Sequence, residues 1–152
     1  MHCGMNSWLK LLLILGVTFL VLRAMQVGWG GSAGAPLPAT VQSLVLEAKA
    51  LDRKAVILIT GSGWCPPCMQ LEREVLSSAD WAAFVDKEVV FKAFDYPNGG
   101  QSTSPAHKDL LKLPGFRGFP AMVVADGEGK VLGMRTGFAG GASDYIGWIR
   151  SL

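Results

Sequence analysis

Cysteine, histidine and charged residues are scarce in this sequence of 152 residues, and their scarcity excludes several common classes of protein. It holds only 3 cysteines and 2 histidines, too few and too scattered for a disulfide-rich scaffold or a four-ligand structural zinc site. Charged residues amount to 17% and the net charge is +2, so no nucleic-acid partner is indicated. We therefore expect no metal, no bound cofactor and no nucleic acid.

The N-terminal apolar run is too short to be a typical membrane span. Residues 11–22 form a core of about 12 apolar residues, the length of a signal-peptide core and short of the ~20 that cross a bilayer as a helix. We expect residues 1–23 to be a cleaved signal peptide or a retained membrane anchor, and residues 24–38, rich in glycine, alanine and proline, to be a flexible linker. Cys3 precedes the apolar run, so it does not look like a lipidated cysteine, and we assign it no role.

Two cysteines lie where an apolar run meets a helical pattern. Ala55–Ile59 is apolar throughout, as in a buried central strand, and a helical periodicity follows Cys68. The C-x-x-C spacing places the sulfurs of Cys65 and Cys68 on one helical turn. Free N–H groups at a helix start favour an anion, so we expect a lowered pKa for Cys65 and a deeper, protected Cys68. Pro66 and Pro67 suit the first turn, and the N–H of Cys68 is expected to face the Cys65 sulfur.

These residues carry a resemblance to the thioredoxin family. Trp64-Cys65-Pro66-Pro67-Cys68 resembles its W-C-x-x-C active site, and Gly118-Phe119-Pro120, ahead of an apolar run, resembles its cis-proline loop. Residues 127–130 resemble the family's hairpin turn, and Gly137-Phe138 its glycine before the last helix. The sequence of residues 60–65 is similar to that of a bacterial exported branch of the family.

The resemblance implies a thioredoxin-like α/β fold over residues 39–152, with a mixed sheet of four to five strands and helices on both faces. The patterns of the chain predict the order α-β-α-α-β-α-β-β-α. The expected elements are helices at 41–51, from Cys68 onward, around Trp81, at 104–113 and after Ser143, and strands at 55–59, 89–95, 121–125 and 131–134. We expect Thr40, Ser78 or Asp80, and Ser143 to cap helices, and Leu51 and Met69 to be buried.

The resemblance also implies the roles of the site residues. Cys65 is the nucleophile and Cys68 the resolving cysteine; the expected substrate contacts are Trp64, Pro66, Pro67, Phe119 and Pro120. Trp64 and Phe119 are each open to a second interpretation as packing residues. His107 is interpreted as a solvated helix residue.

The chain departs from the family at one position. Ile59 stands where classical thioredoxins carry a buried acid, and no acid lies between Ala55 and Cys68. Proton transfer then uses water, or exchange is slower.

The resemblance favours a thiol–disulfide oxidoreductase that reduces protein disulfides on the periplasmic side of the cell envelope, secreted or anchored to the inner membrane. A reductase in an oxidising compartment needs a membrane partner that relays electrons, and we expect a monomer. Three alternatives stay open: a dedicated cytochrome c or thiol maturation factor, a disulfide oxidase or isomerase, and a non-catalytic tethered binding or chaperone-like module.

Overall fold

A computed structural model describes residues 37–97, 99–101 and 104–152. The expected signal or anchor segment at residues 1–23, most of the expected linker and Cys3 lie outside the described residues. Leu37 is already buried in the core, so packing begins slightly before residue 39. No helix within the described ranges is long and apolar enough to cross a membrane.

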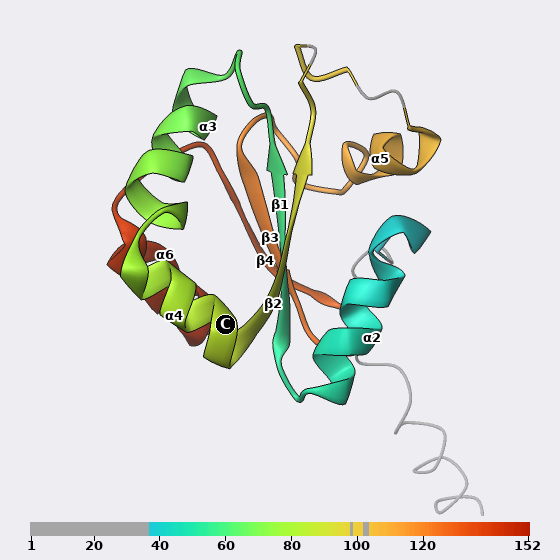
Figure 1. Ribbon diagram of the computed structural model, residues 1–152. Coiled ribbons are helices and arrows are strands. Elements are labelled where there is room, and N and C mark those ends of the chain that lie inside the picture. The colour runs from blue at the N-terminus through green and yellow to red at the C-terminus, as the bar shows by residue number, and fades with distance from the viewer. Residues whose placement is uncertain (1–36, 98, 102–103) are drawn as a thin grey trace, which may run out of the picture. The chain divides into compact units, whose positions relative to one another are not determined.

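A four-stranded mixed sheet with the order β2-β1-β3-β4 forms the centre of the fold (Figure 1). β1 (Lys54–Thr60) runs parallel to β2 (Val89–Asp95) and antiparallel to β3 (Ala121–Ala125), and β3 pairs antiparallel with β4 (Val131–Thr136). The run expected to be a central strand is central, because its apolar side chains are buried on both faces of the sheet. The parallel strands β1 and β2 end together, with Thr60 opposite Asp95.

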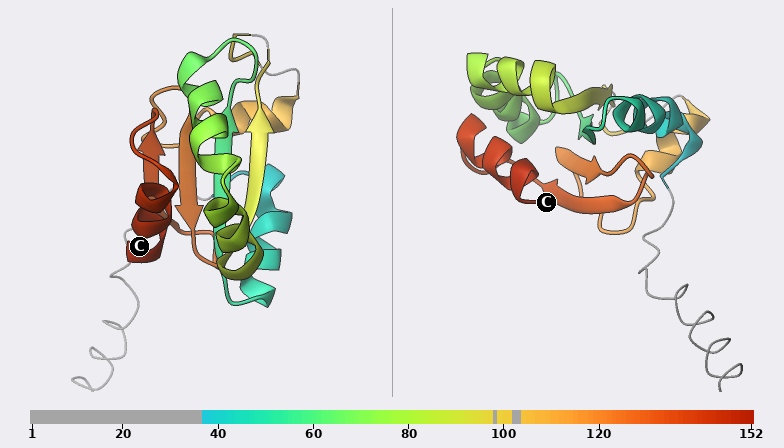
Figure 2. Two further views of the ribbon diagram at one scale, coloured as in Figure 1. Left: turned by 60° about the vertical axis from the view of Figure 1, so that its left-hand side comes forward. Right: turned by 90° about the horizontal axis from the view of Figure 1, so that it is seen from below.

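Helices cover both faces of the sheet, and Figures 1 and 2 show the two layers. One face carries α2 (Gln42–Ala50) and α5 (Pro105–Leu110); the other carries α3 (Pro66–Leu71), its π-wound continuation η2 (Glu72–Leu76), α4 (Ala79–Glu88) and α6 (Ala142–Ser151). Each face of the sheet packs against its own hydrophobic core, and alternate residues of β1 belong to different cores. Ile57 and Ile59 lie in one core, and Val56 and Leu58 lie in the other. The expected order of elements is confirmed.

Two of the expected helix caps are wrong. Thr40 lies inside a short 3₁₀ turn, η1 (Ala39–Val41), and its hydroxyl donates to the carbonyl of Ala106 (2.8 Å). α6 begins one residue before Ser143, and the carboxylate of Asp144 accepts the N–H of Gly141 (2.8 Å) instead. Ser78 caps α4 as expected, because its hydroxyl oxygen accepts the N–H of Trp81 (3.2 Å).

Three expectations of burial are also wrong. Leu51, which forms the C-terminal cap of α2, is 50% exposed. Met69 is 42% exposed, since α3 turns Cys68 and Leu71 inward and leaves Met69 on the outside. His107, expected to be solvated, is half-buried with its ring edge-on to Phe94 (5.3 Å between centroids). The helix expected to reach residue 113 ends at Leu110.

Candidate active site

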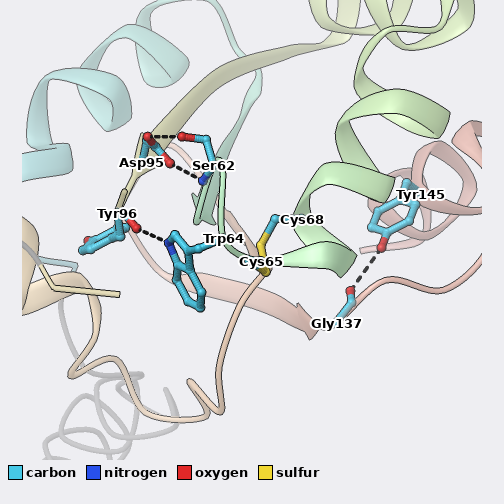
Figure 3. The surroundings of a disulfide bond; sticks show 8 residues. All are labelled: Ser62, Trp64, Cys65, Cys68, Asp95, Tyr96, Gly137 and Tyr145. Atoms are coloured by element: carbon cyan, nitrogen blue, oxygen red, sulfur yellow. Dashed lines mark hydrogen bonds between the residues drawn. A yellow bond between two sulfur atoms is a disulfide. The ribbon is translucent and has the colours of Figure 1, made fainter. Parts of the chain in front are cut away.

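A disulfide joins Cys65 and Cys68 at the carboxyl edge of the sheet, where β1 passes into α3 (Figure 3). Cys65 has an extended backbone and α3 begins at Pro66, so the two prolines occupy helix positions whose N–H groups need no partner. The carbonyl of Cys65 accepts the N–H groups of Cys68 (3.0 Å) and Met69 (3.1 Å). The expectation that the Cys68 N–H faces the Cys65 sulfur is therefore wrong for the disulfide form.

Both cysteines are buried in this form. Cys65 is 4% exposed and Cys68 is 2% exposed, so the contrast expected between an open and a protected cysteine is small. The neighbouring side chains are more open, with Pro66 exposed and Pro67 half-buried. Exposed Trp64, Pro66 and Met69, which we call the apolar rim, thus lie next to the nearly covered cysteines in sequence.

The indole of Trp64 lies between the active-site loop and the cis-proline loop. Its Nε1–H donates to the carbonyl of Tyr96 (2.6 Å), and its ring stands edge-on to Phe119 with 5.3 Å between centroids. The ring also rests on Gly61, where a Cβ atom would lie 2.5 Å from it. Trp64 packs against Phe119 and Gly61, which agrees with its interpretation as a packing residue. Because Trp64 is also 37% exposed, its contact with a substrate stays a prediction.

The cis-proline loop joins the site through the contact of Phe119 with Trp64. The Phe119–Pro120 peptide bond is cis, as the resemblance implied, and Pro120 is buried. Phe119 is half-buried and contacts the ring of Phe116 as well as Trp64, so its packing interpretation is observed. The carbonyl of Pro120 accepts the N–H of Gly137 (2.8 Å), which ties this loop to the turn before α6.

One carboxylate next to the site, that of Asp95, was not predicted from the sequence. Asp95, the last residue of β2, accepts the N–H of Ser62 at Oδ1 (2.7 Å) and its hydroxyl at Oδ2 (2.6 Å). Burial raises the pKa of Asp95, but the hydrogen bonds from Ser62, together with the backbone N–H of Tyr96, outweigh it and hold that pKa below its ordinary value. The sequence did hold a signal for Asp95. It is a polar residue at the carboxyl end of the predicted strand 89–95, which is parallel to the strand that leads into the C-x-x-C motif.

The buried side chains at the site are uncharged. Ile59, at the family's acid position, is fully buried, and the described part of the chain has no buried charged side chain. Tyr96 is fully buried and donates its hydroxyl to the carbonyl of His107 (2.6 Å); burial raises the pKa of Tyr96 to about 12. Within the described ranges, no cluster of histidine, cysteine and acidic residues is suited to a metal ion.

Comparison with known proteins identifies the family to which this chain belongs. A family model described as a thioredoxin-like domain matches residues 42–151. The disulfide bond reductase DsbH of Chlamydia pneumoniae is 30% identical over 111 residues, which cover 70% of this chain and 66% of that protein. The chain thus spans about two thirds of the length of this relative.

Solved structures agree on the fold. A DsbH oxidoreductase superimposes with a TM-score of 0.61 at 23% identity, covering 84% of this chain and 96% of that chain. The oxidised C-terminal domain of DsbD from Neisseria meningitidis gives a TM-score of 0.58 at 24% identity, covering 72% and 89%. From the matched residues and the C-x-x-C disulfide at the start of α3, the chain belongs to the thioredoxin-like domain family.

Proposed function

We propose that this chain is a protein-disulfide reductase of the cell envelope that works through Cys65 and Cys68. The observation that carries the proposal is the disulfide at the start of α3, next to Trp64, whose ring contacts Phe119 of the cis-proline loop. A disulfide that closes so short a loop restricts the unfolded chain little, which argues against a purely structural role. The name of the Chlamydia relative supports reduction as the direction of exchange.

Exchange proceeds in two balanced steps. In the reduced enzyme the Cys65 thiolate attacks one sulfur of a substrate disulfide, which forms a mixed disulfide and releases the other substrate sulfur as a thiolate that takes up a proton. The Cys68 thiolate then attacks the Cys65 sulfur, which frees the second substrate thiol and leaves the Cys65–Cys68 disulfide on the enzyme. The substrate gains two electrons, and an external dithiol must return them.

The surroundings of the disulfide suit a polypeptide substrate. Of the described large apolar side chains that are exposed, Trp64 and Met69 flank the two cysteines in sequence, and exposed Pro66 lies between them. Ile59 supplies no proton carrier, so water takes the proton of Cys68 when it becomes the attacking thiolate.

The envelope location rests on the sequence. The apolar run at residues 11–22 and the likeness of residues 60–65 to exported thioredoxin-like proteins support export. A membrane protein that relays electrons then supplies the reducing equivalents. Fractionation of cells that produce the full chain tests this location, and recovery from the cytosol alone would contradict it.

The activity is tested by insulin-disulfide reduction with a dithiol as electron source. Cys65→Ser should abolish turnover, whereas Cys68→Ser should stop at a mixed disulfide that can be isolated with its substrate. Turnover by Cys65→Ser equal to that of the unaltered chain would refute the proposal. The equilibrium potential of the pair gives the direction: a value above that of the glutathione couple would indicate an oxidase or isomerase instead of a reductase.

A further inference from the structure

The turn that precedes Cys65 contains two glycines, Gly61 and Gly63. Ser62 lies between two glycines, and Gly63 has a φ of +78°, so this segment has high conformational freedom before it is restrained. Ser62 is exposed and is the only residue between Gly61 and Gly63, so it offers the single side chain by which this turn can be held. Its position decides where the next residues, Trp64 and Cys65, are presented.

Asp95 holds this turn from the neighbouring strand. Because β1 and β2 are parallel and in register at Thr60 and Asp95, their carboxyl ends deliver Ser62 and Asp95 to the same edge of the sheet (Figure 3). Each carboxylate oxygen of Asp95 accepts one hydrogen bond from Ser62, at 2.7 Å from the backbone N–H and at 2.6 Å from the hydroxyl. Two short, charge-assisted contacts on one residue fix its direction as well as its position.

The residue after Asp95 holds the next part of the loop. The N–H of Tyr96 donates to the carbonyl of Thr60 (2.9 Å), and the carbonyl of Tyr96 accepts the indole N–H of Trp64 (2.6 Å). The dipeptide at the end of β2 therefore restrains the segment on both sides of Gly63. This segment reaches the reactive pair directly, because the N–H of Cys65 donates back to the carbonyl of Gly61 (3.3 Å).

We propose that Asp95 is a positioning residue for disulfide exchange: its carboxylate holds Ser62, and through this turn it sets the orientation in which Trp64 and Cys65 meet a substrate disulfide. The inference rests on the proposed function, since it assigns Asp95 a part in the reaction of Cys65. Asp95 takes no proton and touches no substrate in this scheme. Its contribution is geometric, and exchange is sensitive to geometry because the attacking thiolate must approach the disulfide in line.

The experiment measures the second-order rate of exchange between reduced enzyme and a protein disulfide as a function of pH. The plateau of this rate reports orientation, and the midpoint of its rise reports the ionisation of Cys65. Asp95→Ala should lower the plateau roughly tenfold, by analogy with other misplaced reactive groups, and leave the midpoint in place. Ser62→Ala removes the hydroxyl contact and keeps the backbone contact, so its plateau should lie between that of the unaltered chain and that of Asp95→Ala.

Asp95→Asn separates geometry from charge. The Asn oxygen accepts the Ser62 N–H and its amide donates to the Ser62 hydroxyl oxygen, so both contacts can form without a negative charge. We expect this variant to restore the plateau to within about twofold of the unaltered chain. Asp86→Ala, which removes an exposed carboxylate on α4, is the matched control for loss of one charge.

Each outcome decides the inference. A plateau for Asp95→Ala that stays within about twofold of the control would overturn it, as would an Asn variant as slow as the Ala variant, because charge would then matter rather than contact. If Asp95→Ala shifted the midpoint of the pH profile and left the plateau unchanged, the inference would likewise be overturned. Failure of the proposed function looks different, since Cys65→Ser would then exchange as fast as the unaltered chain.

Discussion

Gly61 lies directly beneath the indole of Trp64, and adding one methyl group there should displace the ring. A Cβ atom at this position would lie 2.5 Å from the nearest ring carbon, a distance that real Cβ atoms do not tolerate. The backbone of Gly61 lies outside the left-handed region, so Ala itself is not strained. Gly61→Ala therefore tests how much the placement of Trp64 is worth.

The expected cost follows from the two contacts that the displaced ring gives up. The hydrogen bond from Nε1 to the carbonyl of Tyr96 is worth about 1 kcal/mol net, and the edge-on contact with Phe119 about 1 kcal/mol. Loss of glycine's freedom in the unfolded chain returns about 0.5 kcal/mol. We expect a net loss of about 1.5 kcal/mol in the free energy of unfolding.

Urea unfolding of the oxidised protein measures this loss, and α6 offers a matched control. Gly147 lies inside that helix and a Cβ atom there meets nothing within 4 Å, so Gly147→Ala should stabilise the protein by about 1 kcal/mol. The two substitutions make the same chemical change with opposite expected signs. If Gly61→Ala stabilised the protein as Gly147→Ala does, the contacts of Trp64 would contribute nothing and the reasoning would be refuted.

Three further predictions concern the pH dependence of stability and the apolar rim. Tyr96→Phe should cost about 2 kcal/mol, because it leaves the carbonyl of His107 without its donor. The raised pKa of Tyr96 means that its contribution is complete below pH 10 and is lost as the pH rises toward about 12, so urea unfolding across this range should be flatter for Tyr96→Phe than for the unaltered chain. The lowered pKa of Asp95 acts in the opposite range: its contribution is present above the ordinary carboxyl pKa and lost as the pH falls below it, and Asp95→Asn should weaken this acid loss of stability. Met69→Ala should change the free energy of unfolding by less than about 0.5 kcal/mol but slow exchange with protein disulfides, whereas Leu71→Ala should cost about 3 kcal/mol; equal costs would show that Met69 packs in the core.

Most of the fold was predictable because strong local patterns coincide with burial. The apolar run at residues 55–59 is the central strand, and the strand expected at residues 89–95 has those bounds in the structure. The Cys65–Cys68 pair could equally be predicted, since C-x-x-C after such a strand and before a helix combines spacing with context. The cis-proline loop came from family resemblance, because a cis bond has no local signal beyond the proline itself.

The errors fall where a local pattern meets a tertiary boundary. Thr40 has the chemistry of a helix cap, but a 3₁₀ turn precedes α2 and its hydroxyl reaches Ala106 on another element. Leu51 continues an apolar periodicity beyond the last residue of the helix, and Met69 belongs to a helix whose inward direction is set by Cys68 and Leu71. Periodicity predicts a face of a helix, but not where the helix ends or how it is rotated against the sheet.

Residues close together in the chain were enough to predict the class of fold, the order of elements and the C-x-x-C pair that forms the disulfide. What surrounds that pair depends on how distant segments pack together. Trp64 meets Phe119, and Ser62 meets Asp95, only because β1, β2 and the cis-proline loop end at one edge of the sheet. Contacts between segments so far apart in sequence depend on strand order and register, which no local spacing of residues encodes.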